Sequence, residues 1–380
     1  MLAKKWVSFA LAAAFMLCAA PSARVARAED TIKLGIHGAQ TGDLAGYGIP
    51  ALNAAKIVVD QVNAKGGVLG KKVEILQADD QCKPELATNA ATKLISDGAI
   101  VAVGPTCSGA TKAALPLYMD KKIVIISPSA TAPELTQSGK YPYFFRTIPT
   151  DDAQARLGTD FVLEALDAKN IAILHDKGDY GKGYATFAKK AIEESGKANV
   201  VFFEGITPGG LDYSAPIQKI GRSGADTLLY GGYYPEASKL ATVIKNKGLK
   251  LNFVSEDGVK TSNFLQLAGK EGEGVYASSN RDFSDLPMHK AAEAAHQKMF
   301  NAPSGQFFFT AFAATQALLN AVEKAGSTNP DTIAKALRTE YADTVLGKLR
   351  FDAHGDAEDV GFAMFKVVNG AYVDQKFRTQ

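Results

Sequence analysis

The sequence is poor in tryptophan, in cysteine and in net charge. Its 380 residues include one tryptophan and three cysteines. Lysine and arginine number 42, and aspartate and glutamate number 40. Four of the basic residues and no acidic residue lie within residues 1–28, so the remaining chain has 38 basic and 40 acidic residues and a net charge of −2. A chain this close to neutral has no electrostatic basis for binding nucleic acid.

Long apolar runs are also scarce. The one clear example, residues 6–20, has 15 residues, which is short for a membrane span. Lys4 and Lys5 precede it, and an Ala-Arg-Ala cleavage pattern ending at Ala28 follows it. This three-part layout predicts a secretory signal peptide over residues 1–28, cleaved near Ala28, and therefore an exported protein. An uncleaved membrane anchor is the alternative.

Removal of the signal peptide would take away the single tryptophan and one of the three cysteines. Trp6 and Cys18 would be lost, and only Cys82 and Cys107 would remain of the cysteines. In an oxidising compartment an isolated pair of this kind predicts a disulfide. Two free, buried thiols are the alternative. The bridge would close a loop of about 26 residues and stabilise the fold by about 3 kcal/mol.

Motifs of catalysis and cofactor binding are missing. There is no Gly-x-Ser-x-Gly elbow for a serine nucleophile. The histidines are scattered, and His289 and His296 alone do not complete a metal site. Asp79 and Asp80 are neighbours on a predicted strand, so their side chains point to opposite faces. A Gly-x-Gly-x-x-Ala match at 46–51 begins ten residues after the nearest strand, too far for a dinucleotide turn. We therefore expect no enzyme activity, no metal and no cofactor.

Strand and helix patterns alternate from residue 31 to about residue 280, which predicts parallel sheets covered by helices on both faces. The pattern then changes to helices and a β-rich tail. We predict two α/β lobes, the first from 29–149 and 281–358 and the second from 150–280 and 359–380. The predictions include helices at 51–62, 84–96, 153–168, 287–299, 307–325 and 330–339 and strands at 72–76, 100–103, 123–126, 349–351 and 362–368.

Two segments rich in hydroxyl groups, 104–109 and 127–134, follow strands of the first lobe. Helix N-termini at these places would present free N–H groups and a partial positive charge, which suit a carboxylate. The hydroxyls of Ser108 and Thr131 would complete such a site. The alternative is plain N-capping, because Thr131 and Glu134 fit a capping box. The sequence favours neither reading.

The second lobe places aromatic and acidic residues after its strands, in segments 174–181, 230–236 and 255–258. Ligands of open α/β sheets bind beyond the carboxyl ends of the strands, so a cleft between the two lobes is the expected site. We place Tyr47 and Tyr180 in glycine-rich loops, where binding residues are common. We expect Tyr234 to face away from the site, and an acid in this cleft to pair with a cation.

At these segments the sequence resembles the periplasmic branched-chain amino acid binding proteins of bacterial ABC transporters, the Leu/Ile/Val-binding type. The resemblance runs from Glu29 to about Phe365. It rests on the following segments in this order: NAKGG at 63–67, DDQC at 79–82, ISP at 126–128, AT at 130–131, PELT at 133–136, HDK at 175–177, YG at 180–181, FFEGIT at 202–207 and YGGYYPE at 230–236.

The resemblance implies a bilobal type I periplasmic binding protein fold whose lobes are joined by a hinge of three crossings. It implies a monomer that captures a free amino acid, closes around it and delivers it to an ABC permease in the membrane. The residues it implies for the ligand carboxylate are Ser108 and Thr131; for the ligand ammonium, Ser129, Thr131 and Asp257; for the side-chain pocket, Tyr47, Thr106, Cys107, Tyr180, Tyr233 and Phe307, with the Cys82–Cys107 bridge.

Two residues depart from the family pattern. Asp257 stands where the family usually has glutamate, although the neighbouring Glu256 is a second candidate. Thr106 stands where the family has leucine, which makes the pocket less aliphatic. A wider aliphatic or polar range of amino acids is therefore expected. The alternatives are a sensory module on the same fold, and a binder of an amide, urea or aromatic acid, for which a buried, unpaired Asp257 would be unfavourable.

Overall fold

The computed structural model describes residues 31–378. The predicted signal peptide, with Trp6 and Cys18, lies outside the described residues. Among residues 31–378, no helix combines the length and the apolar character that a membrane crossing requires.

Five parallel strands form the first sheet, in the order β2-β1-β3-β4-β5. Ile36 pairs with Val103, and Val103 pairs with Ile126. The carboxyl ends of β1, β3 and β4 therefore lie at one edge, and the segments that follow them meet there. The strands are β1 (Ile32–Gly38), β2 (Val73–Asp79), β3 (Val101–Val103), β4 (Val124–Ser127) and β5 (Phe144–Arg146).

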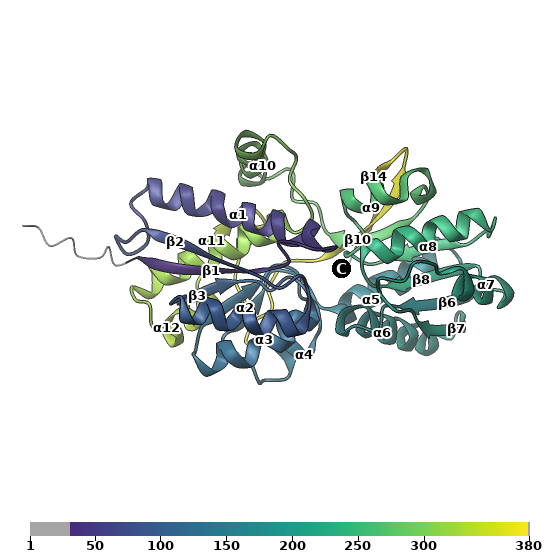
Figure 1. Cartoon of the computed structure of the whole chain (residues 1–380), viewed down its shortest axis with the longest axis horizontal. Helices are drawn as coiled ribbons and strands as arrows, with labels where there is room; N and C mark the ends of the chain where they lie inside the picture. Colours follow the sequence, from purple (N-terminus) through teal and green to yellow (C-terminus); the bar gives the residue numbers. More distant parts are fainter. Residues whose placement is uncertain (1–30, 379–380) are drawn as a thin grey trace, which may run out of the picture. The chain divides into compact units, whose positions relative to one another are not determined.

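Helices cover both faces of this sheet, and successive strand residues face different helices. Val101 and Val103 pack in a core with α1, α11 and α12, whereas Ala102 packs with α2 and α3, as expected for a parallel sheet buried on both sides. Figure 1 shows α1 and α3 on opposite sides of β1 and β3. The lobe contains α1 (Ala45–Ala64), α2 (Pro84–Ser96), α3 (Ser108–Asp120), α4 (Glu134–Gln137), α10 (Pro287–Phe300), α11 (Phe308–Ala325), α12 (Pro330–Thr339), and a small hairpin of β11 (Ala342–Thr344) and β12 (Gly347–Leu349).

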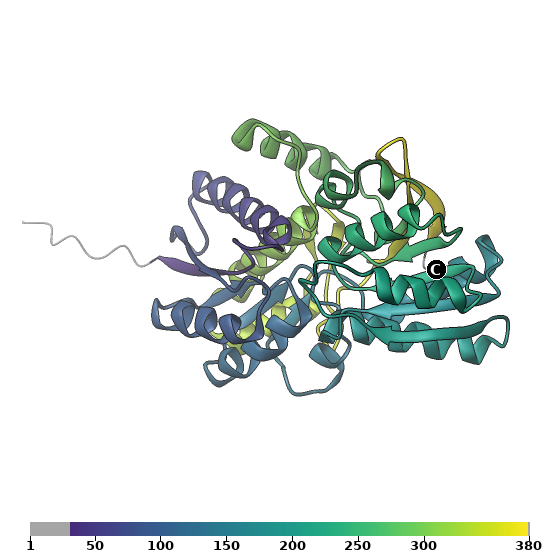
Figure 2. The same cartoon turned by 45° about the vertical axis from the view of Figure 1, so that its right-hand side comes forward.

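Seven strands form the second sheet, in the order β14-β13-β10-β9-β8-β6-β7. The strands from β7 to β10 are parallel, and the antiparallel hairpin of β13 and β14, yellow in Figure 2, completes one edge. The strands are β6 (Asn170–His175), β7 (Asn199–Gly205), β8 (Thr227–Gly231), β9 (Asn252–Ser255), β10 (Tyr276–Asn280), β13 (Phe362–Val368) and β14 (Ala371–Arg378). The helices are α5 (Asp151–Asp160), α6 (Asp179–Ser195), α7 (Ser214–Arg222), α8 (Tyr234–Asn246) and α9 (Ser262–Ala268).

Three connections join elements of the two sheets: β5 to α5, β10 to α10, and β12 to β13. The chain thus passes back and forth between the lobes, as the resemblance implied. The lobe boundaries at 149/150, 280/281 and 358/359 stay a prediction, because strand order does not fix the residue at which one lobe ends.

Several predicted elements need correction. The helix predicted at 51–62 begins at Ala45, because Gly46, Gly48 and Pro50 hide its first turns from a propensity argument. The helix predicted at 153–168 begins at Asp151, ends at Asp160 and continues as a π-helical turn, Phe161–Ala165. The predicted strand at 349–351 is β12, which ends at Leu349. Strand β14 was not anticipated, since it is a largely exposed edge strand and has no continuous apolar run. The predictions at 84–96, 330–339 and 362–368 are confirmed.

Candidate ligand-binding site

The two hydroxyl-rich segments lie against each other at the carboxyl edge of the first sheet. Ser108 is the first residue of α3, and its Oγ accepts hydrogen bonds from the backbone N of Thr131 (3.2 Å) and of Ala132 (3.3 Å). Ser129 Oγ donates to the carbonyl oxygen of Thr106 at 2.6 Å. Backbone N–H groups and hydroxyls from two strand ends are thus collected in one place.

Arg146 of β5 holds the second of these segments. Its side chain is fully buried, and Nη1 donates to the carbonyl oxygens of Ala130 (3.1 Å) and Ala132 (2.8 Å). Its Nε lies 2.5 Å from a carboxylate oxygen of Asp356. Our sequence analysis missed this residue. The available signal was an arginine at the end of the otherwise apolar strand FFR.

Thr131 does not form the predicted capping box. Helix α4 follows Pro133, and no side chain caps it. The Thr131 hydroxyl is fully buried and has no hydrogen-bond partner. Its carbonyl oxygen accepts a hydrogen bond from the backbone N of Asp151 at 2.9 Å. The capping reading is therefore wrong, and the hydroxyl stays available to a ligand.

Asp257, after β9, is buried in the second lobe. Its Oδ1 accepts hydrogen bonds from Gln154 Nε2 (3.0 Å) and from the hydroxyl of Tyr180 (2.5 Å), while Oδ2 has no partner. Burial raises the pKa of this carboxyl, and the two hydrogen bonds oppose the rise. The neighbouring Glu256 has a different partner: its Oε1 accepts a hydrogen bond from the backbone N of Gly232 at 2.6 Å. Burial raises the pKa of Glu256 well above the usual value.

Asp151, the first residue of α5, is a second buried acid that our sequence analysis missed. Both carboxyl oxygens are buried without a hydrogen-bond partner. Burial raises the pKa of Asp151 to about 8; the charge of Asp257 adds to the rise, while the nearby Thr131 hydroxyl and Arg146 lower it. The Thr131 hydroxyl is close enough to lower the pKa of this carboxyl, but the two groups do not form a regular hydrogen bond. The missed signal was an acid at the start of a helix, Thr150-Asp151.

Four aromatic side chains form a continuous wall between the lobes. The ring of Tyr233 lies 5.9 Å from that of Tyr47 and 5.2 Å from that of Tyr180, and Tyr47 lies 5.3 Å from Phe307, measured between ring centroids. The hydroxyl of Tyr47 also donates to the carbonyl oxygen of Gly258 in the second lobe. Tyr47 and Tyr180 lie in the first turns of α1 and α6, not in glycine-rich loops as predicted.

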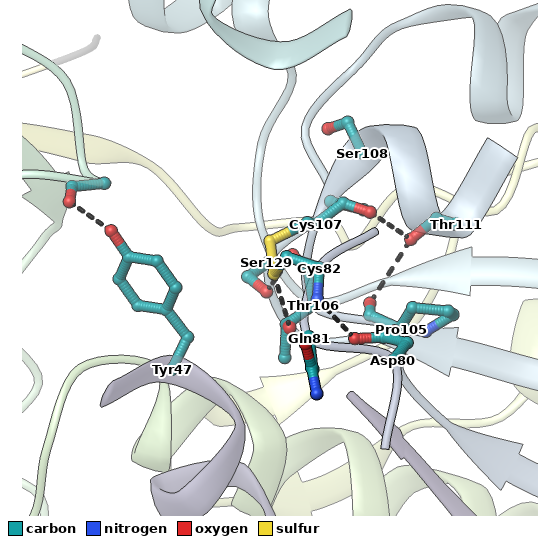
Figure 3. The surroundings of a disulfide bond; sticks show 12 residues. Tyr47, Asp80, Gln81, Cys82, Pro105, Thr106, Cys107, Ser108, Thr111 and Ser129 are labelled. Atoms are coloured by element: carbon teal, nitrogen blue, oxygen red, sulfur yellow. Dashed lines mark hydrogen bonds between the residues drawn. A yellow bond between two sulfur atoms is a disulfide. The ribbon is translucent and has the colours of Figure 1, made fainter. Parts of the chain in front are cut away.

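The predicted disulfide between Cys82 and Cys107 is present, with a Cα–Cα distance of 5.4 Å. Figure 3 shows it beside Thr106 and Ser129, across from Tyr47. Asp80 Oδ1 accepts from the backbone N of Cys82 at 2.8 Å and fixes the turn that carries this cysteine. The bridge ties the turn after β2 to the start of α3.

A small cavity lies where these groups meet. Its volume is about 10 Å³, close to that of one water-sized sphere, so the walls from the two lobes nearly touch. All predicted site residues except Thr131 and Cys82 line it, and Gly258 lines it as well. The lining comprises Tyr47, Thr106, Cys107, Ser108, Ser129, Tyr180, Tyr233, Asp257, Gly258 and Phe307. Glu256 and Tyr234 are not part of this lining.

The glycines at 46–51 have a packing role. They lie within α1, and a Cβ on Gly48 would be 1.9 Å from the carbonyl oxygen of Ala39. Only glycine allows α1 to begin so close to the segment after β1. Within the described residues 31–378, no group of three or more His, Cys, Asp or Glu side chains is placed to hold a metal ion.

Comparisons with known proteins agree with this geometry. A model of the family described as periplasmic binding protein matches residues 31–371. The chain is 38% identical over 339 residues to the leucine-, isoleucine-, valine-, threonine-, and alanine-binding protein of Pseudomonas aeruginosa, covering 89% of this chain and 90% of that protein. It is 36% identical over 353 residues to the Leu/Ile/Val-binding protein of Escherichia coli, covering 93% and 95%.

Solved structures show the same fold. One is the branched-chain amino acid transporter substrate binding protein LivJ of Streptococcus pneumoniae in complex with isoleucine. It is 28% identical to this chain, with a TM-score of 0.82, and the match covers 90% of this chain and 99% of LivJ. A solute binding protein of Rhodopseudomonas palustris in complex with benzoate has a TM-score of 0.80 at 21% identity, covering 91% and 95%, which shows the fold alone. The predicted two-lobed α/β fold is confirmed.

Proposed function

Because this chain belongs to the periplasmic binding protein family, we propose that it captures a free amino acid between its two lobes and delivers it to an ABC permease. It acts in the periplasm, as a monomer, after removal of a signal peptide near Ala28. It binds its ligand without chemical change, and the single observation that carries the amino acid assignment is the pair of buried, uncompensated carboxyls Asp257 and Asp151.

The first lobe supplies the ligand's carboxylate site. The hydroxyl of Ser108 and the backbone N–H of Thr131 already face each other at 3.2 Å. A ligand carboxylate would accept a hydrogen bond from the Ser108 hydroxyl and would replace Ser108 Oγ as the acceptor of the Thr131 N–H. The unpartnered hydroxyl of Thr131 would add another bond, and bonds to an ionised acceptor are stronger than neutral ones.

The second lobe supplies the ammonium site, with Asp257 after β9 and Asp151 in the first turn of α5. Neither Asp257 nor Asp151 takes part in an ion pair within the described residues, and burial raises both pKa values. Burial disfavours the charged form of a carboxyl, and a cation beside it favours that form again. The ammonium of an amino acid supplies that cation. The carbonyl of Ser129 and the hydroxyl of Thr131 would complete the site.

The pocket wall suits a side chain of modest size with mixed polarity. Tyr47, Tyr233 and Phe307 supply apolar surface, whereas Thr106 adds a hydroxyl that lies 3.7 Å from Cys82 Sγ. We propose branched-chain amino acids with an extension to small aliphatic and polar ones. The Pseudomonas aeruginosa relative, whose name includes threonine and alanine, supports this wider range.

Calorimetric titration of the protein, unfolded and refolded to remove carried-over ligand, tests the proposal. We expect binding of leucine, isoleucine or valine, and weaker binding of alanine or threonine. The matched controls are 4-methylpentanoate, which is leucine without its ammonium, and leucinamide, which is leucine without its carboxylate; neither should bind comparably. Binding of benzoate or an amide with no response to any amino acid would contradict the proposal and favour the alternative ligand class.

A further inference from the structure

A second and much larger cavity lies beside the connection from β10 to α10. Its volume is about 450 Å³, which is ample for a small organic molecule. Lys260 and Phe365 of the second lobe form part of its wall, and His289 and Phe309 of the first lobe form another part. Figure 1 shows the chain passing from β10 in the second lobe to α10 in the first lobe.

The charged groups of this cavity favour an anion. Lys260 and Arg281 are its cations, and Asp282 is its one carboxylate. Asp282 already accepts a hydrogen bond from the backbone N of Ser284 at 2.8 Å. Lys260 makes no ion pair within the described residues; its ammonium lies over the ring of Phe365, 4.8 Å from the centroid. Burial lowers the pKa of Lys260, and the charge of Asp282 opposes this shift.

The remaining wall suits an apolar body. His289 stacks on Phe309 with ring centroids 3.5 Å apart, and Arg281 lies over Phe283 at 5.0 Å. These stacked groups present flat, largely apolar surfaces to the cavity.

The geometry points to a second binding site: this cavity takes a small organic carboxylate with an apolar body. The carboxylate pairs with Lys260, and the body packs between Phe309 and Phe365. This ligand is distinct from the amino acid, whose cavity lies on the other side of Gln306 and Phe307.

The two cavities share a wall, which links the two ligands. Phe307 lines both cavities. Gln306 lines the second one, and its Nε2 donates to the carbonyl oxygen of Asp257 (3.1 Å) and to Ser279 Oγ (3.3 Å). A carboxylate that contacts both lobes favours the arrangement that also holds the amino acid. Each ligand should therefore raise the affinity of the other by the same factor. This linkage, unlike the second site itself, rests on the proposed amino acid function.

Calorimetry with phenyllactate tests the second site. This probe has a carboxylate, a hydroxyl and an aromatic body, and it is titrated into protein saturated with the amino acid that binds best. We expect one phenyllactate per chain. The uncharged 3-phenylpropane-1,2-diol and inorganic phosphate are the matched controls, which lack the charge and the body respectively, and both should bind far more weakly. No binding to the saturated protein, or simple competition with the amino acid, would overturn the second site.

Variants locate the probe. Lys260→Gln should weaken phenyllactate binding about tenfold, the effect of losing a charged hydrogen-bond partner, and Lys270→Gln, at an exposed lysine of the same lobe, should not. His289→Leu keeps all formal charges and provides an independent test if Lys260→Gln fails to fold. Unchanged phenyllactate binding in both folded variants would overturn the site. If phenyllactate binds but does not change the affinity for the amino acid, the linkage is overturned and the second site stands. Each variant is also titrated with the amino acid alone. Loss of amino acid binding in that titration would point to a failure of the proposed function and not of the second site.

Discussion

Asp257 and Asp151 are the residues on which the proposed chemistry depends. Each is buried, each retains at least one carboxyl oxygen without a partner, and neither forms an ion pair within residues 31–378. Burial raises the pKa of both carboxyls, and a ligand ammonium beside them would favour the ionised form. Asp151, whose pKa is raised to about 8, therefore connects ligand binding to proton release.

Replacement of Asp257 by asparagine should weaken amino acid binding on the order of a hundredfold, or about 3 kcal/mol, because the ammonium loses a buried charge partner. The amide oxygen can still accept from Gln154 and Tyr180, so the free energy of unfolding of the ligand-free protein should change little. Calorimetry and urea unfolding measure the two quantities. Glu256→Gln is the matched control; a larger loss of affinity for it would assign the ammonium to Glu256.

Asp151 should make both binding and stability depend on pH. Its pKa is raised to about 8 from a usual value of 3.8. The folded, ligand-free state therefore favours the protonated form. This stabilisation is complete below about pH 4 and is lost as pH rises through about 8. A bound ammonium favours the ionised form, so binding near pH 7 should release close to one proton.

Calorimetry in buffers with different ionisation enthalpies measures this proton release. The release should disappear in Asp151→Asn, and the unfolding free energy of that variant should fall less between pH 4 and pH 8 than that of the wild type. Asp152→Asn, at the adjacent exposed residue, is the control. Proton release that persists in Asp151→Asn would assign the proton to Glu256 or Asp257.

At the scale of elements, the segment between β4 and α4 is a binding loop without regular structure of its own. Arg146 on the neighbouring strand β5 fixes it by donating to two of its carbonyl oxygens. The loop can then hold the backbone N of Thr131 toward Ser108. The position of a ligand carboxylate is thus set by packing between two strands, and the loop alone does not determine it.

Arg146→Met should therefore reduce both stability and affinity. The methionine fills part of the volume but removes the arginine's hydrogen bonds to two carbonyl oxygens and its ion pair with Asp356, which should lower the free energy of unfolding by about 3 kcal/mol. Binding should weaken in the same variant, because the loop loses its anchor. Urea unfolding and calorimetry measure these effects. Arg350→Met, which removes a partly exposed ion pair with Glu358, should change neither quantity greatly; equal effects in both variants would contradict the anchoring role.

At the scale of the whole folded region, contacts between the lobes surround the amino acid cavity. The hydroxyl of Tyr47 donates to the Gly258 carbonyl, that of Tyr234 donates to the Asp43 carbonyl, and Lys112 of α3 pairs with Asp179 of α6 at 2.9 Å. These contacts come from segments that are far apart in the sequence. They hold the lobes together once a ligand bridges them.

Tyr47→Phe should speed the dissociation of the amino acid. The ring and its packing remain, but one hydrogen bond between the lobes is lost, which is worth about 1 kcal/mol or about fivefold in affinity. Dissociation rates from stopped-flow tyrosine fluorescence measure this effect. Tyr143→Phe, whose lost bond to Asp331 lies within the first lobe, should leave the rate unchanged. A loss confined to the association rate would show that Tyr47 acts before closure.

Most of the elements could be predicted because apolar periodicity reports burial locally. Helices α2 and α12 and strand β13 match their predicted ranges. The place of Ser108 after a strand is visible in the sequence, whereas the role of Asp257 came from the family resemblance. Asp151 and Arg146 escaped because nothing in their neighbours shows that their side chains are buried. Tyr47 was assigned to a loop since glycines obscured the start of α1.

The sequence by itself determined the alternation of strands and helices, the family and the residue types available at each strand end, because these depend on local pattern and composition. Only the tertiary structure decided which side chains share one cavity. It placed Asp257 in the lining of the small cavity and Glu256 outside it, left the hydroxyl of Thr131 without a hydrogen-bond partner, and set Asp151 near that hydroxyl. Such choices depend on burial and on partners from distant segments, and a carboxyl acquires its charge preference only when those neighbours exclude water.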